Sequence, residues 1–384
     1  MPPSARTLSA LLCRYGAGEP LACEPLSEGL LNRGYRLATT RGRFFLKHHL
    51  DGDPDVDDPE AVPHLAQQHR ATAALASLGL PVAPPLADRD GHTVAVHRGR
   101  RYALHPWVDG RHRAGAELSP SECRRLGALL GRVHRGLEHV IGQIMGYVGP
   151  VAHLGHLSRP AQRAQPAAVA GRGATGLAAR RPPPAPASAD PADTYALIER
   201  LLARIRGRAR RSGFDELAEC RLLERRDLLG RHAHRRPHGG QAPPWGWVHG
   251  DFHPLNLLYR AEGPGPDGPV EPAAIIDWDR LGVRPRAEEV VRAAAIFFLR
   301  PDGGLELDKV RAYARAYRHG TCTDAAELAE AVHRVWWERL NDFWILRWHY
   351  ERNDHRADAQ FAATAALVSW WTHHTPAVHD AFCD

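Results

Sequence analysis

The sequence predicts an α+β protein, with short strands in its first part and helices in its last part. Alternating, β-prone runs joined by turns recur between residues 20 and 104, and apolar residues recur at helical spacing near the C-terminus. At 384 residues the chain can bury a large core, so two lobes or two domains are expected. Its hydrophobic residues, 43% of the total, are as frequent as in ordinary globular proteins.

A β-hairpin is expected within residues 20–50, after the turn-rich stretch 28–34. Residues 35–39 alternate between apolar and polar side chains, and Arg41-Gly42-Arg43 can form a tight turn. Residues 44–47 continue as a second strand. The turn and the two strand patterns together predict an antiparallel pair.

Lys47, at the end of this hairpin, is one of only two lysines in a chain with fifty basic residues. The other is Lys309, and every remaining basic residue is arginine. A compact ammonium group suits a phosphate pocket in which a forked guanidinium would not fit. We therefore interpret Lys47 as a ligand of nucleotide phosphates, against the alternative of a strand lysine without a function.

A helix is expected over residues 60–80, where Gly79 and Pro81 would end it. Two further strands are expected at residues 93–96 and 102–104. The first part of the chain, up to about residue 104, is therefore predicted to contain several strands and one helix between them.

Helices are expected to dominate the rest. Ser119 is a typical N-cap residue, with Pro120 in the first helical position and Glu122 placed to complete a capping box. Later helices are expected at residues 194–198, 214–232 and 286–299. Residues 155–191, rich in Ala, Pro, Arg and Gly without apolar periodicity, are expected to be a flexible insertion.

The net charge of +6 comes from one segment, because residues 156–240 hold seventeen arginines and eight acidic residues. Nucleic-acid binding would need a basic face on a folded domain. We interpret the segment as solvated or disordered and expect no nucleic-acid partner. No apolar run reaches a membrane-spanning length, and we see no signal peptide. Six widely spaced cysteines without a C-x-x-C motif favour a reduced, cytoplasmic protein, while the oligomeric state is left open.

The most informative segment is His249-Gly250-Asp251-Phe252-His253-Pro254-Leu255-Asn256. After it, the apolar run 274–276 ends in Asp277-Trp278-Asp279. A phosphotransferase of the kinase type needs an Asp that accepts or orients the proton of the attacking hydroxyl, and an Asn and a second Asp that hold Mg²⁺ on the nucleotide phosphates. The spacing from Asp251 to Asn256 equals that of the protein-kinase loop H-R-D-x-x-x-x-N, with Gly250 in place of the arginine.

These two motifs resemble those of the aminoglycoside phosphotransferase/choline kinase-like family, and the resemblance extends more loosely over about residues 24–300. It implies a protein-kinase-like bilobal fold. Residues 1–106 would form a small nucleotide-binding lobe with an antiparallel sheet, and residues 107–384 a larger, mostly helical catalytic and acceptor lobe. It also implies transfer of the γ-phosphate of ATP, with Mg²⁺, to a small hydroxyl compound similar to an aminoglycoside, choline or a sugar.

The resemblance assigns the central residues their roles. Asp251 would be the catalytic base, and Asn256 and Asp277 would ligate Mg²⁺. Lys47 would hold the α- and β-phosphates of ATP. Asp279 would either orient the residues that bind the metal and the phosphates, or contact the acceptor.

Other residues would bind the nucleotide or support the site. Gly29 and Asn32 fall in the loop that covers the nucleotide in this family. His105 and Trp107 fall in the hinge between the lobes, where backbone groups bind adenine. The supporting residues would be His249 and His253 in the loop, Glu288 or Glu289 as an acid that fixes it, and His134 in a structural role.

The sequence departs from the family at one position. The family's first helix carries a glutamate that pairs with the strand lysine, but no glutamate occurs between Glu60 and Glu117. Gln68 lies about where it is expected. Glu60 takes the role, Gln68 makes a neutral hydrogen bond, or Lys47 is held in another way.

The acceptor end carries a cluster of tryptophans. Trp337, Asn341, Trp344 and Trp348 share one helical face, with Glu338, Asp342 and Glu351 nearby. An aromatic wall with carboxylates would suit a cationic acceptor. Packing in the core is the competing interpretation, because apolar stripes at helical spacing are usually buried.

Two other functions compete with the kinase hypothesis. A metallohydrolase would use His249, Asp251 and His253 with Asp277 and Asp279 as mixed nitrogen and oxygen ligands. A non-catalytic nucleotide-binding protein would explain the missing helix glutamate. The kinase spacing of Asn256 and the presence of Lys47 favour the phosphotransferase.

Overall fold

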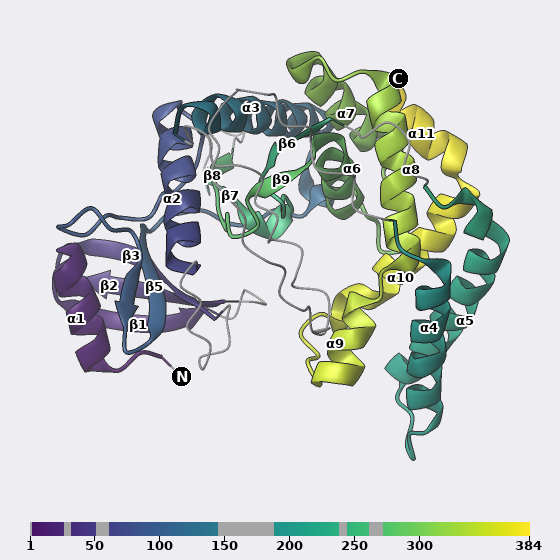
Figure 1. Ribbon diagram of the computed structural model, residues 1–384, viewed down its shortest axis with the longest axis horizontal. Helices are drawn as coiled ribbons and strands as arrows, with labels where there is room; N and C mark the ends of the chain where they lie inside the picture. Colours follow the sequence, from purple (N-terminus) through teal and green to yellow (C-terminus); the bar gives the residue numbers. More distant parts are fainter. Residues whose placement is uncertain (1, 27–31, 51–60, 145–187, 238–243, 261–271) are drawn as a thin grey trace, which may run out of the picture.

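The computed structural model describes residues 2–26, 32–50, 61–144, 188–237, 244–260 and 272–384. It has a sheet-containing lobe formed by the first part of the chain and a larger lobe made mainly of helices (Figure 1). The predicted α+β class is confirmed. The exact boundary at residue 106 stays a prediction.

The N-terminal lobe is built on one five-stranded sheet in the order β1-β2-β3-β5-β4. Its strands are β1 (Pro20–Leu26), β2 (Arg33–Thr39), β3 (Gly42–His49), β4 (Ala95–His97) and β5 (Arg100–Pro106). All neighbours pair antiparallel. The predicted hairpin is confirmed, with Tyr35 opposite Leu46 and Gly42 at the tip in a positive-φ conformation.

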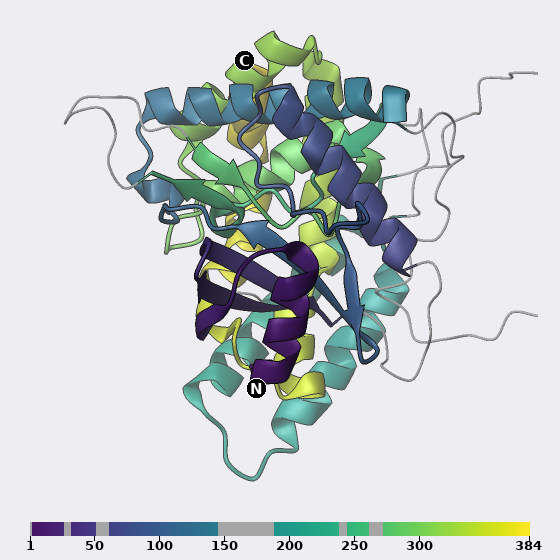
Figure 2. The same ribbon diagram turned by 90° about the vertical axis from the view of Figure 1, so that its left-hand side faces the viewer.

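Helix α1 (Ala5–Tyr15) covers this sheet, and the sequence analysis did not predict it. Figure 2 shows the helix lying against the sheet. Its signals are an N-cap, Ser4, and a C-cap glycine, Gly16, in the left-handed conformation. Its apolar face packs on Tyr35, Leu37 and Leu46 of the sheet.

Helix α2 (Ala61–Ser77) runs from the sheet to α3 (Pro120–Ile144), which begins the second lobe (Figure 2). Leu75 of α2 is fully buried in the core that α3 shares. The predicted capping box is present, because Ser119 Oγ accepts from Glu122 N and the Glu122 carboxylate accepts from Ser119 N.

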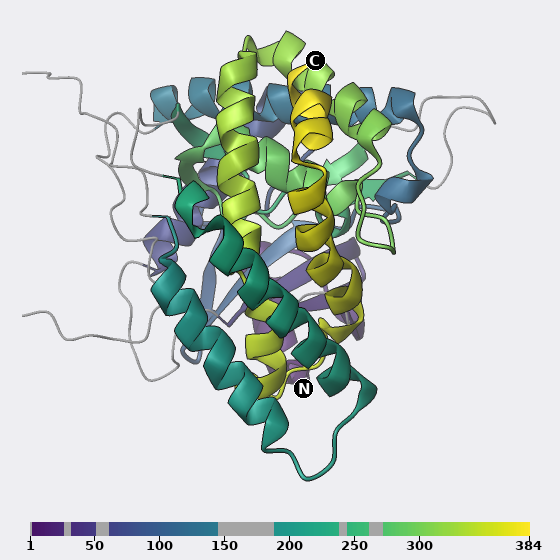
Figure 3. The same cartoon turned by 90° about the vertical axis from the view of Figure 1, so that its right-hand side faces the viewer.

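Eight further helices form the C-terminal lobe of the described chain: α4 (Pro191–Arg206), α5 (Gly213–His232), α6 (Arg286–Phe297), α7 (Leu307–Thr321), α8 (Ala325–Asn341), α9 (Trp344–Arg352), α10 (Asp358–His373) and α11 (Thr375–Cys383). Figure 3 shows α4 and α5 side by side and joined by a short loop. In the described part of the chain, no helix combines the length and the apolar character that crossing a membrane requires.

The tryptophan cluster belongs mainly to the core. Trp336, Trp337 and Trp371 are fully buried. Trp337 Nε1 donates to the carbonyl oxygen of Ala189, so this side chain faces the start of α4. Of the two interpretations, core packing holds for Trp337, because burial of an indole in a helix contact uses its large apolar surface. The single helical face is wrong, since Trp337 and Asn341 belong to α8 whereas Trp344 and Trp348 belong to α9.

Most of the expected flexible insertion, residues 155–187, lies outside the described residues. Its last four residues do not fit that prediction. Asp190 is the N-cap of α4, whose first residue is Pro191, and Ser188 Oγ donates to Pro237 O. The cap and this contact order the segment, which composition alone could not indicate.

Two small sheets present the two motifs, and β6 of one of them packs against α3 and α6. In one, β6 (Trp245–Val248) pairs with β9 (Gly282–Pro285), and in the other, β7 (Leu257–Tyr259) pairs with β8 (Pro272–Ile275). Both pairs are antiparallel. The loop from β6 to β7 and the loop from β8 to β9 therefore meet, and Ile276 N donates to Asn256 O at 2.9 Å.

Candidate active site

The loop after β6 makes a turn that only glycine fits well. Gly250 has φ +84°, and a Cβ there would overlap the carbonyl oxygen of Arg280. Glycine is tolerated at positive φ because it has no Cβ. The close approach of the two loops explains why glycine stands where the protein-kinase loop has arginine.

Glu289 of α6 binds the backbone of this loop. Its carboxylate accepts from the backbone N–H of His249, at 3.2 Å, and from that of Gly250. His134 Nε2 donates to the same carboxylate at 2.7 Å. Burial alone would raise the pKa of Glu289, but His134 and His249 lower it below its usual value. Glu288 instead pairs with Arg292.

His249 is buried, and both ring nitrogens are engaged. Nε2 donates to the carbonyl oxygen of Ile276 at 3.0 Å, and Nδ1 accepts from Asp251 N at 3.2 Å. Burial lowers the pKa of the imidazole. His249 is thus a neutral connector between the two loops.

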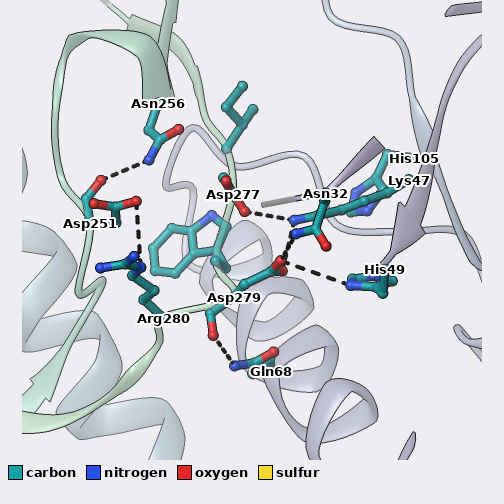
Figure 4. A network of polar contacts seen from close by, with 12 residues as sticks. Asn32, Lys47, His49, Gln68, His105, Asp251, Asn256, Asp277, Asp279 and Arg280 are labelled. Atoms are coloured by element: carbon teal, nitrogen blue, oxygen red, sulfur yellow. Dashed lines mark hydrogen bonds and ion pairs between the residues drawn. The ribbon is translucent and has the colours of Figure 1, made fainter. Parts of the chain in front are cut away.

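The Asp251 side chain is partly exposed, and His253 Nε2 lies 3.6 Å from its carboxylate. Arg280 Nε lies 3.8 Å from the same carboxylate (Figure 4). Burial alone would raise the pKa of Asp251, but His253, Arg280 and His249 lower it. Asn256 Nδ2 donates to the backbone oxygen of Asp251 at 2.8 Å. The side chain of Asn256 is thereby oriented, and Asp251 is held as an ionised carboxylate.

Lys47 crosses from β3 to the second motif. Its Nζ lies 2.6 Å from Asp277 Oδ1 and 2.7 Å from Asp279 Oδ1 (Figure 4). Burial alone would lower the pKa of Lys47, but Asp279 and Asp277 raise it above its ordinary value. The lysine is therefore charged and is shared between two carboxylates. Asp277 adopts φ 59°, a conformation that L-residues rarely take.

Asp279 is the centre of a second set of contacts. Asn32 Nδ2 donates to its Oδ2 at 2.5 Å, and His49 Nδ1 lies 3.8 Å from the same oxygen. Gln68 Nε2 of α2 donates to its backbone oxygen at 2.8 Å. Gln68 thus makes a neutral hydrogen bond to the Asp279 backbone, with Lys47 held by carboxylates from the second motif. Glu60 lies outside the described residues.

The hinge residues are placed on β5 and just after it. The His105 side chain is partly buried, its Nδ1 donates to Ala83 O at 3.0 Å, and desolvation lowers its pKa to about 4. Trp107 N donates to Arg43 O at 3.2 Å, and the guanidinium of Arg36 lies over the Trp107 ring. Adenine binding by this segment stays a prediction. Gly29 lies outside the described residues.

Sequence reasoning missed two features of the site. The contact between Arg280 and Asp251 had no signal in the motif. The joint contact of Asp277 and Asp279 with Lys47 had none either, because Asp277 takes a positive φ of 59° and the alternation of an extended strand does not apply to this segment. Trp278 between them is buried.

The chemistry of the donor set fits a hard divalent cation. Asn256 and Asp277 offer amide and carboxylate oxygens, which Mg²⁺ prefers. The backbone bond from Ile276 N to Asn256 O brings the two residues' loops together. Mixed nitrogen ligation is disfavoured, since both nitrogens of His249 are already used.

Comparison with known proteins agrees with this chemistry. The model described as the phosphotransferase enzyme family matches residues 22–325. A homoserine kinase of Caulobacter sp. (strain K31) is 32% identical over 127 residues, 33% of this chain and 37% of that protein. A homoserine kinase of Beijerinckia indica subsp. indica is 24% identical over 333 residues, 85% of this chain and 80% of that protein.

The fold has solved counterparts. The amicoumacin kinase hAmiN, in complex with AMP-PNP, Ca²⁺ and Ami, aligns with a TM-score of 0.54 at 15% identity, covering 95% of this chain and 92% of that one. This similarity confirms the predicted kinase-like bilobal fold and carries no information on the substrate. The chain matches less than half the length of the first curated relatives, 37% and 42%.

Proposed function

Since the chain belongs to the phosphotransferase enzyme family, matched over residues 22–325, we propose that it transfers the γ-phosphate of ATP to a hydroxyl group of a small molecule. The observation that carries the proposal is the 2.6 Å contact between Lys47 of one lobe and Asp277 of the other. It joins the only lysine of the N-terminal lobe to the loop beside Asn256 and Asp251. Phosphoryl transfer needs these groups in one place.

Each charged side chain has a distinct task in this function. Asp251 accepts or orients the proton of the acceptor hydroxyl, and its lowered pKa keeps it in the ionised form that can accept. Asn256 and Asp277 would hold Mg²⁺, which neutralises phosphate charge when bound. Lys47 supplies a fixed positive charge for the phosphates. Asn32 and the segment around Trp107 would enclose the nucleotide.

Asp279 has a positioning role in the proposal. A lysine shared between two carboxylates can give up one of them and remain anchored by the other. When Asp277 turns to the metal, Asp279 keeps Lys47 in place, and Asn32 and Gln68 keep Asp279 in place. This arrangement would do the work of the absent helix glutamate, and it argues against a protein that has lost catalysis.

The charges beside Asp251 favour an acceptor that carries an anionic group. Arg280 lies 3.8 Å from the Asp251 carboxylate. The pKa of the half-buried Arg284 is lowered by burial and by the nearby Arg292 and Arg280. A further positive charge beside these arginines would be repelled. Glu338 is neutralised by Arg292. A hydroxy amino acid, such as the homoserine in the names of the relatives, suits this field better than a polycationic aminoglycoside.

An acceptor panel tests the proposal. The purified protein would be incubated with Mg²⁺-ATP and homoserine, choline, sugars or aminoglycosides, and products identified by mass. A phosphorylated hydroxyl compound is the expected result, and Asp251→Asn is the matched inactive control. ATP binding without any phosphorylated product would favour a non-catalytic nucleotide-binding protein. Hydrolysis that depends on a transition metal would favour a metallohydrolase. We propose that the protein is located in the cytoplasm, because widely spaced cysteines are typical of reduced proteins.

A further inference from the structure

Three ligand atoms converge at the corner between α9 and α10, far along the chain from the nucleotide motifs. His349 Nδ1 lies 2.8 Å from Asp358 Oδ2 and 3.0 Å from His355 Nδ1. His355 Nδ1 lies 3.2 Å from the same Asp358 oxygen. We call these three residues the corner triad. Each atom of the triad is within hydrogen-bonding distance of the other two.

Hydrogen bonds cannot satisfy these three contacts together. As a carboxylate, Asp358 only accepts, so both imidazoles must donate to it through Nδ1. The two N–H groups then face each other with their nitrogens 3.0 Å apart. If either Nδ1 accepts instead, its lone pair faces the carboxylate oxygen. A ring of three atoms cannot alternate donors and acceptors, whereas a cation satisfies three lone pairs at once.

The surroundings hold the triad in this arrangement. The His349 ring stacks on Phe214, with centroids 4.1 Å apart and planes 12° apart, and it contacts Tyr350 on another side. Asp358 is the first residue of α10. Its second oxygen, Oδ1, is buried and has no hydrogen-bond partner among the described residues. A buried carboxylate oxygen without a partner is costly, and a cation bound to both oxygens of the carboxylate would reduce that cost.

We propose that His349, His355 and Asp358 bind a divalent transition-metal ion such as Zn²⁺. Two imidazole nitrogens and one carboxylate are ligands that such ions prefer to Mg²⁺ or Ca²⁺. An ion about 2.1 Å from each of the three atoms fits their separations and would see them at angles of roughly 85–100°. The remaining positions open towards solvent on the side of His355, whose side chain is 51% exposed.

The second group of comparable residues does not have these properties. Asp88, Asp90 and His92 also lie close together. Asp88 is already paired with Arg14 at 2.6 Å and accepts from two backbone N–H groups. Its carboxylate is satisfied, so a metal would have to displace existing bonds.

The consequence of binding at the corner triad is structural. The ion would tie the last turn of α9 to the first turn of α10 across the short loop between them (Figure 3). Anything that binds only the folded state raises its stability by mass action. Zn²⁺ should therefore stabilise the C-terminal lobe independently of Mg²⁺-ATP.

The test compares the full-length protein with two ligand variants after treatment with a chelator. Zn²⁺ is titrated by calorimetry in the presence of excess Mg²⁺, and the melting temperature is measured with and without Zn²⁺. Co²⁺ absorption in the visible range gives a second readout. His355→Ala is the main variant because the side chain is exposed, and Asp358→Asn keeps the shape of the carboxylate. His373→Ala, an exposed histidine of the same helix α10, is the matched control.

The wild type and His373→Ala should take up one equivalent of Zn²⁺ with a rise of several degrees in melting temperature. His355→Ala and Asp358→Asn should bind Zn²⁺ at this site at least about tenfold more weakly and lose the rise. All four proteins should keep the same response to Mg²⁺-ATP. Equal Zn²⁺ uptake and equal melting shifts in the wild type and His355→Ala would overturn the proposal, as would no uptake by the wild type.

Discussion

Lys47 and Asp279 form a largely buried ion pair, 2.7 Å from Nζ to Oδ1, that links β3 to the loop after β8. We infer that this pair replaces the lysine–glutamate pair of related kinases. Gln68, near the expected place of the glutamate, reaches the backbone of Asp279 and supports the same pair from the other side. In the proposed function the second motif would thus organise the nucleotide site, and α2 would contribute the supporting hydrogen bond of Gln68.

Lys47→Ala should lower the affinity for Mg²⁺-ATP by at least about tenfold, which corresponds to about 1.4 kcal/mol. The reason is the loss of the only fixed positive charge that β3 points at Asp277. For each protein, the melting temperature with saturating Mg²⁺-ATP is compared with the melting temperature of the same protein without ligand. Lys309→Ala removes the other lysine of the chain and should keep the rise. If Lys47→Ala keeps the full rise, the phosphate role of Lys47 is wrong.

Gln68→Glu should impair the protein although it restores the residue type usual in related kinases. The change removes a donor to Asp279 O and adds a negative charge beside Asp279, so stability should fall by about 1–3 kcal/mol. Weaker Mg²⁺-ATP binding is also expected, because Asp279 would shift relative to Lys47. Denaturant unfolding and nucleotide titration measure the two effects. Ala73→Glu adds the same charge at an exposed position of α2 and should be close to neutral; a gain of activity in Gln68→Glu would contradict the inferred pair.

Asp251→Asn and Asp277→Asn should separate the two halves of the reaction. In the proposed function Asp251, which lies next to Arg280, faces the acceptor, so its amide variant should keep nucleotide binding and lose phosphoryl transfer by a factor of roughly 10² or more. Asp277→Asn should weaken Mg²⁺-dependent nucleotide binding as well. Product mass and nucleotide affinity are measured for both. Equal loss of Mg²⁺-ATP affinity in the two variants, or full transfer by Asp251→Asn, would refute the assignment of roles.

Gly250→Ala should distort the catalytic loop. The added Cβ overlaps the carbonyl oxygen of Arg280, and φ is +84°. Gly99→Ala is the matched control, because Gly99 also has a positive φ, +71°, but a Cβ there meets nothing within 4 Å. The control should lose about 1–2 kcal/mol from backbone strain alone. Gly250→Ala should lose more than the control and should also lose phosphoryl transfer; identical losses of stability, with transfer intact, would show that the close contact does not matter.

Local patterns were enough to predict much of the fold. The alternation in residues 35–39 and the glycine turn at Gly42 specified the hairpin, and the capping residues Ser119 and Glu122 specified the start of α3. Such signals involve only a few neighbouring residues, so they can be recognised in a single sequence. Helix α1 was missed although Ser4 and Gly16 cap it, because its short apolar patch was considered only in ruling out a signal peptide.

The sequence by itself predicted the chemistry of the site. The spacing of Asp251, Asn256 and Asp277 and the rarity of lysine indicated which groups would bind the nucleotide and the hydroxyl. Only the tertiary structure decided which carboxylate holds Lys47, that Gln68 serves the backbone of Asp279, and that Trp337 is core. The physical reason is that these choices depend on distances and burial between segments far apart in the chain. A spacing rule describes neighbours along the backbone, whereas the burial of a charge or an indole depends on everything that folds around it.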